Sequence, residues 1–171
     1  MRRALVTGGN SKFGKAFVRE LKKSYHVTVI DREDLLSKDL DKYRGVYELV
    51  FFNHHYTPEE FDYTSFDMNC LVCLDVLDIV NYTEKVGWMV SSGVGAKIKP
   101  EYAPYFAYKS VNIHIMRHLT HTDNEIYFCI DPGHLPKNQY YKSYATQLVK
   151  TISGINEGGR VYMLNGSVSG L

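Results

Sequence analysis

The stretch ALVTGGNSKFG at residues 4–14 places an apolar run, a pair of glycines and the start of a helix in succession. Ala4 to Val6 is typical of a buried strand, and Gly8 and Gly9 permit a tight turn. Apolar residues then recur every four positions, which predicts a helix over about residues 13–24. The N-terminus of such a helix presents free backbone N–H groups and a partial positive charge that suit a pyrophosphate. The stretch therefore predicts a nucleotide-binding turn, or else a turn that only joins a strand to a helix.

The rest of the chain alternates strand-like apolar runs with helix-like amphipathic stretches. Short runs rich in Val, Ile and aromatic residues are separated by longer amphipathic stretches, which indicates parallel strands joined by crossover helices. We expect strands at residues 26–30, 48–53, 86–92, 125–130 and 160–164, a short strand at Leu35–Leu36, and helices at about 64–81, 104–118 and 140–155. No linker or repeat interrupts the alternation. We therefore expect one α/β domain over residues 1–171, with a doubly wound, mainly parallel sheet and its ligand at the carboxyl ends of the strands.

Composition excludes several classes of protein. The chain has 171 residues, of which 44% are hydrophobic and 23% charged, as in an ordinary globular domain. Twenty Lys and Arg side chains against nineteen Asp and Glu leave a formal charge of +1, so no net field favours nucleic acid or an anionic membrane. No apolar run reaches the roughly 20 residues of a membrane span, no signal peptide is visible, and three cysteines are too few for a secreted disulfide scaffold. We expect a cytoplasmic protein without a nucleic-acid or membrane partner.

Asp31 ends the second expected strand, about 20 residues after the glycine turn. An acidic side chain at this point can accept hydrogen bonds from both ribose hydroxyls of a dinucleotide, and it repels a 2′-phosphate. Its alternative role is to cap the residues that follow. Arg32, and Lys12 in the glycine turn, could instead pair with such a phosphate. We therefore expect NAD as the cofactor, with NADP possible.

A second chemical pattern lies in the sequence Tyr105-Phe-Ala-Tyr-Lys109. Residues four apart share one face of a helix, so this tyrosine and this lysine lie together. An ammonium near a phenol favours the phenolate and lowers the pKa of the tyrosine. Ser91 and Ser92, at the end of the preceding strand, add hydroxyl donors for an oxygen that gains negative charge.

Taken in order along the chain, these motifs resemble the short-chain dehydrogenase/reductase family. After the glycine turn TGGNSKFG come Ser92, thirteen residues before Tyr105, then the YxxxK motif of Tyr105 and Lys109, and then Pro132-Gly133 behind the next strand. The resemblance covers nearly the whole chain. It implies the Rossmann fold and an NAD(P)-dependent oxidoreductase that reduces a carbonyl or oxidises an alcohol of a small molecule by hydride transfer.

The resemblance also implies a role for each matching residue. Tyr105 would be the general acid/base, and Lys109 would lower its pKa and bond the nicotinamide ribose. Ser92 would hold the substrate oxygen, and Asn69 would anchor a water in a proton relay. Asp39-Leu40 resembles the acidic–apolar pair that contacts adenine. No metal site is expected, and the cofactor-binding residues expected are Gly8, Ser11, Lys12, Phe13, Gly14, Asp31, Arg32, Asp39, Leu40, Asn53, Lys109, Pro132 and Gly133.

The sequence departs from the family pattern at several points. Lys12 replaces the middle glycine of TGxxxGxG, and His54-His55 follows Asn53 where the family has Ala-Gly. The two histidines either line the active site or pack beside the strand end. Asp31 and Asn53 are 22 positions apart, too few for a full helix, strand and helix. The last helix begins soon after Gly133, which implies a reduced substrate lid and an open active site.

Assembly is a further implication of the resemblance. A homodimer or homotetramer would pair through the helices at about 64–81 and 104–118. The apolar run Leu71-Val72-Cys73-Leu74 is more than one face of a surface helix requires, which favours such pairing.

Two weaker patterns keep alternative interpretations. His114, His118 and His121 fall at helical spacing and could bind a metal, but we favour a helix or subunit-contact face. Cys70 and Cys73 form a CxxC pair without a second pair, for which core packing is favoured over zinc.

Two functional alternatives also stay open. One is a non-catalytic nucleotide-binding sensor or scaffold, and the other is a nucleotide-sugar reductase or epimerase. The presence of Ser92, Tyr105 and Lys109 together favours an enzyme.

Overall fold

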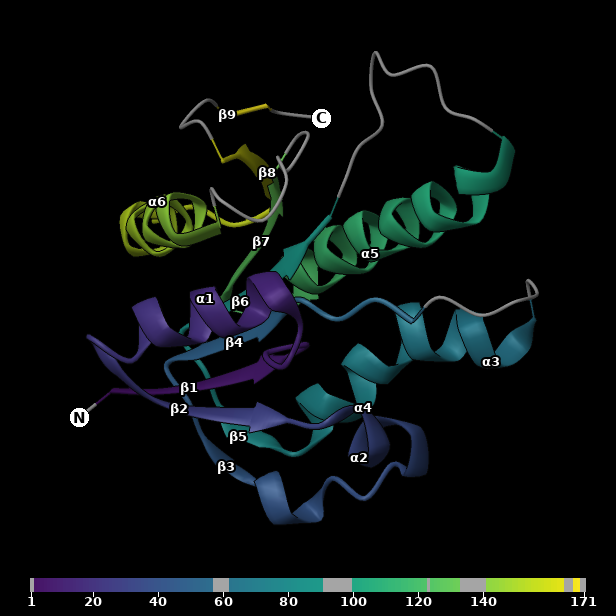
Figure 1. The fold of residues 1–171 in the computed structure, drawn as a ribbon, viewed down its shortest axis with the longest axis horizontal. Coiled ribbons are helices and arrows are strands. Elements are labelled where there is room, and N and C mark those ends of the chain that lie inside the picture. The colour runs from purple at the N-terminus through teal and green to yellow at the C-terminus, as the bar shows by residue number, and fades with distance from the viewer. Residues whose placement is uncertain are drawn as a thin grey trace.

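A parallel sheet forms the centre of the computed structural model, which describes residues 2–56, 62–90, 100–122, 124–132, 141–164 and 168–169. Within these ranges, seven strands form one sheet in the order β2-β1-β4-β6-β7-β8-β9 (Figure 1). The strands are β1 (Arg2–Thr7), β2 (Tyr25–Ile30), β4 (Leu49–Phe52), β6 (Lys85–Met89), β7 (Ile126–Asp131), β8 (Arg160–Met163) and β9 (Val168–Ser169). Neighbouring strands are parallel except β8 and β9, which are antiparallel.

Helices cover both faces of the sheet (Figure 1). On one face, α1 (Lys12–Leu21) packs beside α6 (Tyr141–Gly154). On the other lie α4 (Val72–Asp78) and α5 (Ala103–Thr122). The shorter helical elements are α2 (Arg32–Ser37), η1 (Asp41–Tyr43), α3 (Tyr63–Phe66), the π-helical turn η2 (Asp67–Leu71) and η3 (Pro100–Tyr102). Outside the main sheet, β3 (Gly45–Val46) pairs with β5 (Val80–Tyr82).

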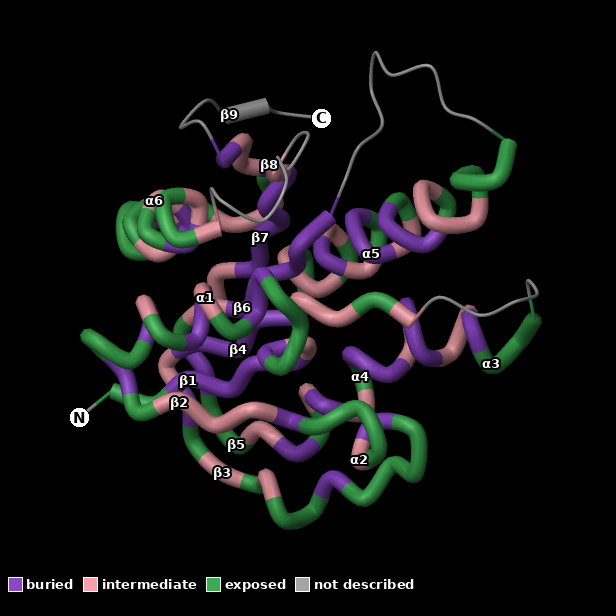
Figure 2. Tube along the Cα trace, in the orientation of Figure 1, coloured by how far each residue is buried: buried purple, intermediate pink, exposed green. Residues whose placement is uncertain are grey.

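Alternate residues of the strands supply the two layers of the core, because successive side chains of a strand point to opposite faces. On β1, Ala4 and Val6 belong to the cluster that contains Phe17 of α1. Leu5, between them, belongs to the cluster that contains Val72 of α4. Figure 2 shows the resulting buried strands between helices whose outer sides are exposed.

The predicted α/β, doubly wound sheet is confirmed, but the predicted strand at Leu35–Leu36 is wrong. These residues lie in α2, where Leu35 is buried and Leu36 is 43% exposed. Glu33 and Asp34 stand in the first turn of this helix, where acidic side chains are favourable. The short interval before β4 thus holds two short helical elements and β3, and adds no strand to the main sheet.

The position of β1 between β2 and β4 determines where a ligand can bind. The chain leaves β1 through α1 to reach β2 on one side, and then returns to β4 on the other side. At such a reversal of strand order, the loops at the carboxyl ends of neighbouring strands separate and leave a crevice. The loops after β1, β2 and β4 therefore define the expected site. In the part of the chain that the structure describes, no helix combines the length and apolar character needed to cross a bilayer.

We expect Gly14→Ala to destabilise the fold. An added Cβ would lie 2.1 Å from the carbonyl oxygen of Gly8 and 2.8 Å from Ser11 Oγ, so the turn between β1 and α1 would have to shift. Overpacking of this kind costs about 1–3 kcal/mol. Urea unfolding monitored by circular dichroism measures the free energy of unfolding.

The matched control is Gly154→Ala at the end of α6, where an added Cβ meets nothing within 4 Å. This change should leave the free energy of unfolding within about 0.5 kcal/mol of wild type or raise it slightly. Equal stabilities of the two variants would contradict the close approach at Gly14.

Candidate functional site

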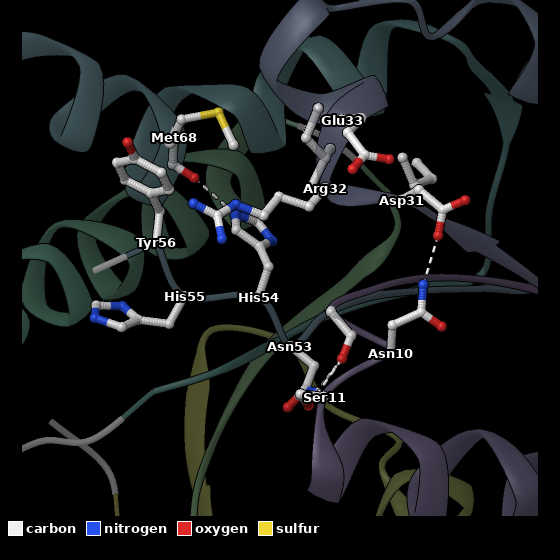
Figure 3. A pocket seen from close by; sticks show the side chains of 13 residues that line it. Asn10, Ser11, Asp31, Arg32, Glu33, Asn53, His54, His55, Tyr56 and Met68 are labelled. Atoms are coloured by element: carbon white, nitrogen blue, oxygen red, sulfur yellow. Dashed lines mark hydrogen bonds between the residues drawn. The ribbon is translucent and has the colours of Figure 1, made fainter. Parts of the chain in front are cut away.

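A cavity of about 400 Å3 lies at the carboxyl ends of β1, β2 and β4 (Figure 3). It is therefore in the crevice that the strand order predicts. The loops after these three strands, the start of α2 and the η2 turn provide its walls. The residues that line it are Gly8, Asn10, Ser11, Ile30, Asp31, Arg32, Glu33, Leu35, Asn53, His54, His55, Tyr56 and Met68.

The glycine turn forms one wall of the cavity. Gly8 has φ +67°, a left-handed conformation that favours glycine. Ser11 caps α1: its hydroxyl accepts a hydrogen bond from the Gly14 N–H at 3.0 Å and donates to the Gly8 carbonyl at 3.0 Å. Because the first N–H groups of a helix have no partner within it, the start of α1 offers donors and a partial positive charge beside the cavity.

Asp31 stands on the opposite wall, at the N-cap position of α2. Its side chain makes no capping hydrogen bond to that helix. Instead, Asn10 Nδ2 donates to Asp31 Oδ1 at 2.5 Å, which links the end of β2 to the glycine turn. The carboxylate is exposed and lines the cavity. The geometry thus favours a ligand-facing role for Asp31 over the helix-capping alternative.

His54 ties together three parts of the site. A backbone carbonyl can only accept, so His54 Nε2 carries the proton that it donates to the Met68 carbonyl at 2.8 Å. Burial and then the charge of Lys109 lower the pKa of His54 to about 4, so the ring is neutral near pH 7. Nδ1 therefore accepts from the Thr7 hydroxyl at 2.6 Å. These bonds connect the end of β1, the loop after β4 and the η2 turn.

Tyr105 and Lys109 lie on α5 beside this loop. Lys109 is 5% exposed, and its Nζ donates to the His54 carbonyl at 3.5 Å and lies 5.6 Å from the ring centre of Tyr105. The Tyr105 ring stands edge-to-face against His55, with ring centres 4.6 Å apart. The structure therefore brings the predicted tyrosine–lysine pair to the two histidines. Both histidines line the cavity, and His54 also packs beside the strand ends through Thr7.

The pKa values of the pair follow burial more than their mutual charge. Burial lowers the pKa of Lys109 to about 8. Burial, and then the charge of Asp131, raise the pKa of Tyr105. The lowered pKa expected for this tyrosine from its spacing to Lys109 is therefore not what the structure has, because loss of water outweighs the ammonium.

Asn69 is buried in the π-helical turn η2, and its side-chain groups are engaged by the backbone. Its Oδ1 accepts from the Tyr56 N–H at 2.8 Å, and its Nδ2 donates to the carbonyls of Tyr56 and Ser65 at 2.8 Å each. Its own carbonyl accepts from Asn112 Nδ2 at 3.0 Å. Asn69 thus holds the chain at Tyr56, which differs from the water-anchoring role that the resemblance implies.

Several predicted cofactor residues lie away from the cavity. Lys12 is exposed at the first position of α1, and Phe13 packs against Phe17 and Tyr141, with ring centres 6.5 and 5.8 Å apart. Gly14 supports the turn by its closeness to Gly8.

The remaining predicted site residues lie away from the cavity, at the end of β7, or outside the described residues. Asp39 is exposed and forms an ion pair with Lys42 at 3.6 Å, whereas Leu40 is buried in the core, so neither lines the cavity. Pro132 directly follows β7 and is half-buried. Ser92 and Gly133 lie outside the described residues.

Sequence reasoning missed four residues that matter for the site. Asn10 stands within the glycine turn and lines the cavity, so its position was a usable signal. Thr7 ends the first strand and faces His54 only after β1 and β4 pair. Tyr56 and Met68 carry no local pattern that indicates a cavity, since they meet only through the folded loop.

The cavity residues fit the adenosine and pyrophosphate parts of a dinucleotide. The start of α1 and the left-handed Gly8 suit an anion, and the Asp31 carboxylate suits ribose hydroxyls. Ile30, Leu35 and Met68 add an apolar wall for a flat base. Among the described residues, no group of three or more His, Cys, Asp or Glu side chains is placed to hold a metal ion.

The weaker motifs have structural explanations within the described residues. His114, His118 and His121 are exposed on α5, as a surface or contact face requires. Cys70 and Cys73 are buried free thiols, and Cys73 Sγ donates to the Cys70 carbonyl at 2.7 Å. Burial raises the pKa of both thiols, to about 11 for Cys70 and about 12 for Cys73.

Comparison with known proteins identifies the fold. No family model matches the sequence, and no curated protein matches it. A carbonyl reductase from Pseudomonas aeruginosa PAO1 matches with a TM-score of 0.79 at 15% identity over 100% of both chains. A carbonyl reductase from the same organism in complex with NADP matches with a TM-score of 0.76 at 13% identity, also over 100% of both chains.

A third match is a short chain dehydrogenase family protein from Francisella tularensis subsp. tularensis SCHU S4, with a TM-score of 0.66 at 18% identity over 91% of this chain and 78% of that one. The chain has the fold of the short-chain dehydrogenases/reductases. The resemblance seen in the motifs is thereby confirmed at the level of the fold.

We expect the stability of the protein to fall as the pH decreases from 6.5 toward 4. The pKa of His54 is about 4 in the folded protein, against 6.5 for an unperturbed histidine, so the unfolded chain binds its proton first and protonation favours unfolding across this window. Between pH 7 and pH 5 the loss linked to His54 is on the order of 1–2 kcal/mol, and His55, whose pKa burial also lowers to about 4, adds to the loss in the same window. Urea unfolding at a series of pH values measures it.

In the His54→Gln variant this pH dependence should be clearly smaller. The control His26→Gln removes an exposed histidine on β2 and should keep the wild-type dependence. An identical pH dependence in wild type and His54→Gln would show that His54 does not contribute to it.

Proposed function

We propose that the chain is an NAD(P)-dependent oxidoreductase of the short-chain dehydrogenase/reductase family, which reduces a carbonyl or oxidises an alcohol of a small molecule. The observation that carries this proposal is the contact between the Tyr105–Lys109 pair and the loop that lines the cavity. A proton donor and a cation thus adjoin a cavity whose other end suits a nucleotide. A single domain over residues 1–171 and a cytoplasmic location stay predictions.

The proposal assigns the dinucleotide to the described cavity. Asp31 would accept hydrogen bonds from the adenosine ribose, and Ser11 with the start of α1 would bind the pyrophosphate. Asn53 and Lys109 would lie beside the second ribose, and Pro132 and Gly133 near the nicotinamide. When bound, the dinucleotide supplies or accepts the hydride.

Tyr105 would exchange the proton with the substrate oxygen. Its raised pKa keeps the phenol protonated near neutral pH, which suits proton donation during carbonyl reduction. Lys109, with its pKa near 8, is mostly charged at pH 7 and would stabilise the phenolate that remains. Ser92 would hold the substrate oxygen, and Asn69 would act through the loop at Tyr56 that it holds.

We infer NAD(H) as the preferred cofactor, with NADP(H) possible. Asp31 supports NAD(H) because its carboxylate repels a 2′-phosphate. NADP(H) stays possible because Arg32 is a cation that lines this end of the cavity, and because one of the matching carbonyl reductases was solved with NADP. Thermal shift assays with NADH and with NADPH, followed by a carbonyl panel read at the nicotinamide absorbance, test both cofactor and activity. Cofactor binding without turnover of any carbonyl would favour the non-catalytic sensor.

We expect Tyr105→Phe to lower the turnover of an active carbonyl substrate by about 10²–10⁴-fold while NADH binding persists. The variant removes only the hydroxyl and keeps the ring against His55. Steady-state kinetics at saturating NADH measures the loss.

Tyr102→Phe is the matched control, because Tyr102 is 54% exposed in η3, just before α5. It should keep wild-type turnover. If Tyr105→Phe also keeps wild-type turnover, Tyr105 is not the proton donor.

A homodimer or homotetramer also stays a prediction. The structure explains much of the apolar run Leu71–Leu74 by core packing, since Val72 and Cys73 are buried. Leu74 is 41% exposed on α4 and is the residue that would lie in a subunit contact. Light scattering should give a mass of at least two chains, and Leu74→Glu should reduce it. A monomeric wild-type mass at micromolar concentration would contradict the prediction.

A further inference from the structure

Two neighbouring residues of opposite charge are held toward different walls of the cavity. The Asp31 carboxylate is bound by Asn10, so it faces the glycine turn. The guanidinium of the next residue, Arg32, reaches across the cavity in the other direction (Figure 3). It lies over the ring of Tyr56, with 5.1 Å between Cζ and the ring centre. This distance is within the range of a cation–π contact.

Tyr56 is held by hydrogen bonds to its backbone and by packing of its ring. Its backbone N–H and carbonyl are both bound by the side chain of Asn69, each at 2.8 Å. Its ring packs against the core cluster and is half-buried. The Arg32 side chain is exposed and has more rotatable bonds than the tyrosine, so a conformational change that separates the pair costs less at Arg32. Whatever binds Arg32 elsewhere must first separate it from Tyr56.

We propose that Tyr56 is a specificity-determining residue that favours NAD(H) over NADP(H) by holding Arg32 away from the adenosine ribose. This inference rests on the proposed function, because it assigns the adenosine ribose to Asp31. A ribose with free hydroxyls needs only the Asp31 carboxylate. A 2′-phosphate at the same place meets the negative charges of Asp31 and Glu33, so it needs a cation to compensate.

Among the described residues that line the cavity, Arg32 carries a guanidinium, and a guanidinium binds phosphate through two parallel hydrogen bonds. In wild type that binding requires loss of the contact with Tyr56. An exposed cation–π contact corresponds to about a two- to fivefold factor in affinity. The affinity for NADPH is therefore lowered by this factor relative to the affinity for NADH. Removal of the aromatic ring should abolish the difference.

The test is isothermal titration calorimetry of the 171-residue chain with NADH and with NADPH. Tyr56→Leu keeps apolar bulk but has no π face, so the ratio of the NADPH to the NADH dissociation constant should fall about two- to fivefold. Tyr56→Phe is the matched control: it keeps the ring, and the wild-type ratio should persist. Thermal unfolding without ligand checks that each variant is folded, and Tyr56→Met replaces Tyr56→Leu if the latter does not fold.

A double-mutant cycle assigns the effect to Arg32. In an Arg32→Leu background, Tyr56→Leu should no longer change the ratio of the two dissociation constants. Failure of wild type to bind either dinucleotide would overturn the proposed function itself. Binding of both dinucleotides with an unchanged ratio in the Tyr56→Leu variant, or a ratio that changes equally without Arg32, would overturn the role of Tyr56 alone.

Discussion

The site depends on the close approach of backbone segments around the glycine turn after β1. An added Cβ on Gly8 would lie 2.7 Å from the backbone of Asn53 and of His54, and one on Gly14 would lie 2.1 Å from the Gly8 carbonyl. Only glycine permits both contacts. They place the start of α1 against the end of β1 and bring the loop after β4 beside it. The glycine turn and the loop after β4, held together in this way, both line the cavity.

The loop after β4 is the second organising element, and its departures from the family pattern have a structural role. His54 is hydrogen-bonded at both ring nitrogens, and its carbonyl accepts from Lys109. Asn69 binds the same loop two residues later, at Tyr56. His54, one of the two histidines that stand where the family has Ala-Gly, therefore holds the loop against β1, η2 and α5 by hydrogen bonds. The proposed catalytic pair and the nucleotide wall are coupled through this one segment.

Much of the fold could be predicted from the sequence because its signals are local. The glycine turn, the four-residue spacing of apolar residues in α1 and the buried runs of the strands each act within a few residues. The predicted strand at Leu35–Leu36 was wrong because two adjacent leucines show no hydrophobic periodicity that distinguishes a helix from a strand. Nothing in the sequence indicates that Leu40 enters the core while Asp39 remains outside the cavity.

The site was less predictable than the fold because it depends on contacts between distant segments. The bonds of Asn69 to Tyr56 and of Thr7 to His54 join residues 13 and 47 positions apart. The pKa of Tyr105 depends on burial and on Asp131, which its spacing to Lys109 does not contain. Spacing indicated which residues share a helix face, whereas solvation and long-range pairing decided their chemistry.

The central claim is that the cavity after β1, β2 and β4 binds a nicotinamide dinucleotide by its adenosine and pyrophosphate parts. The most direct test is isothermal titration calorimetry, in which NADH is titrated into the protein with and without ADP-ribose. ADP-ribose has the adenosine and pyrophosphate parts but no nicotinamide. The account predicts saturable binding with one site per chain and competition by ADP-ribose. Absence of NADH binding, or NADH binding that ADP-ribose does not displace, would contradict it.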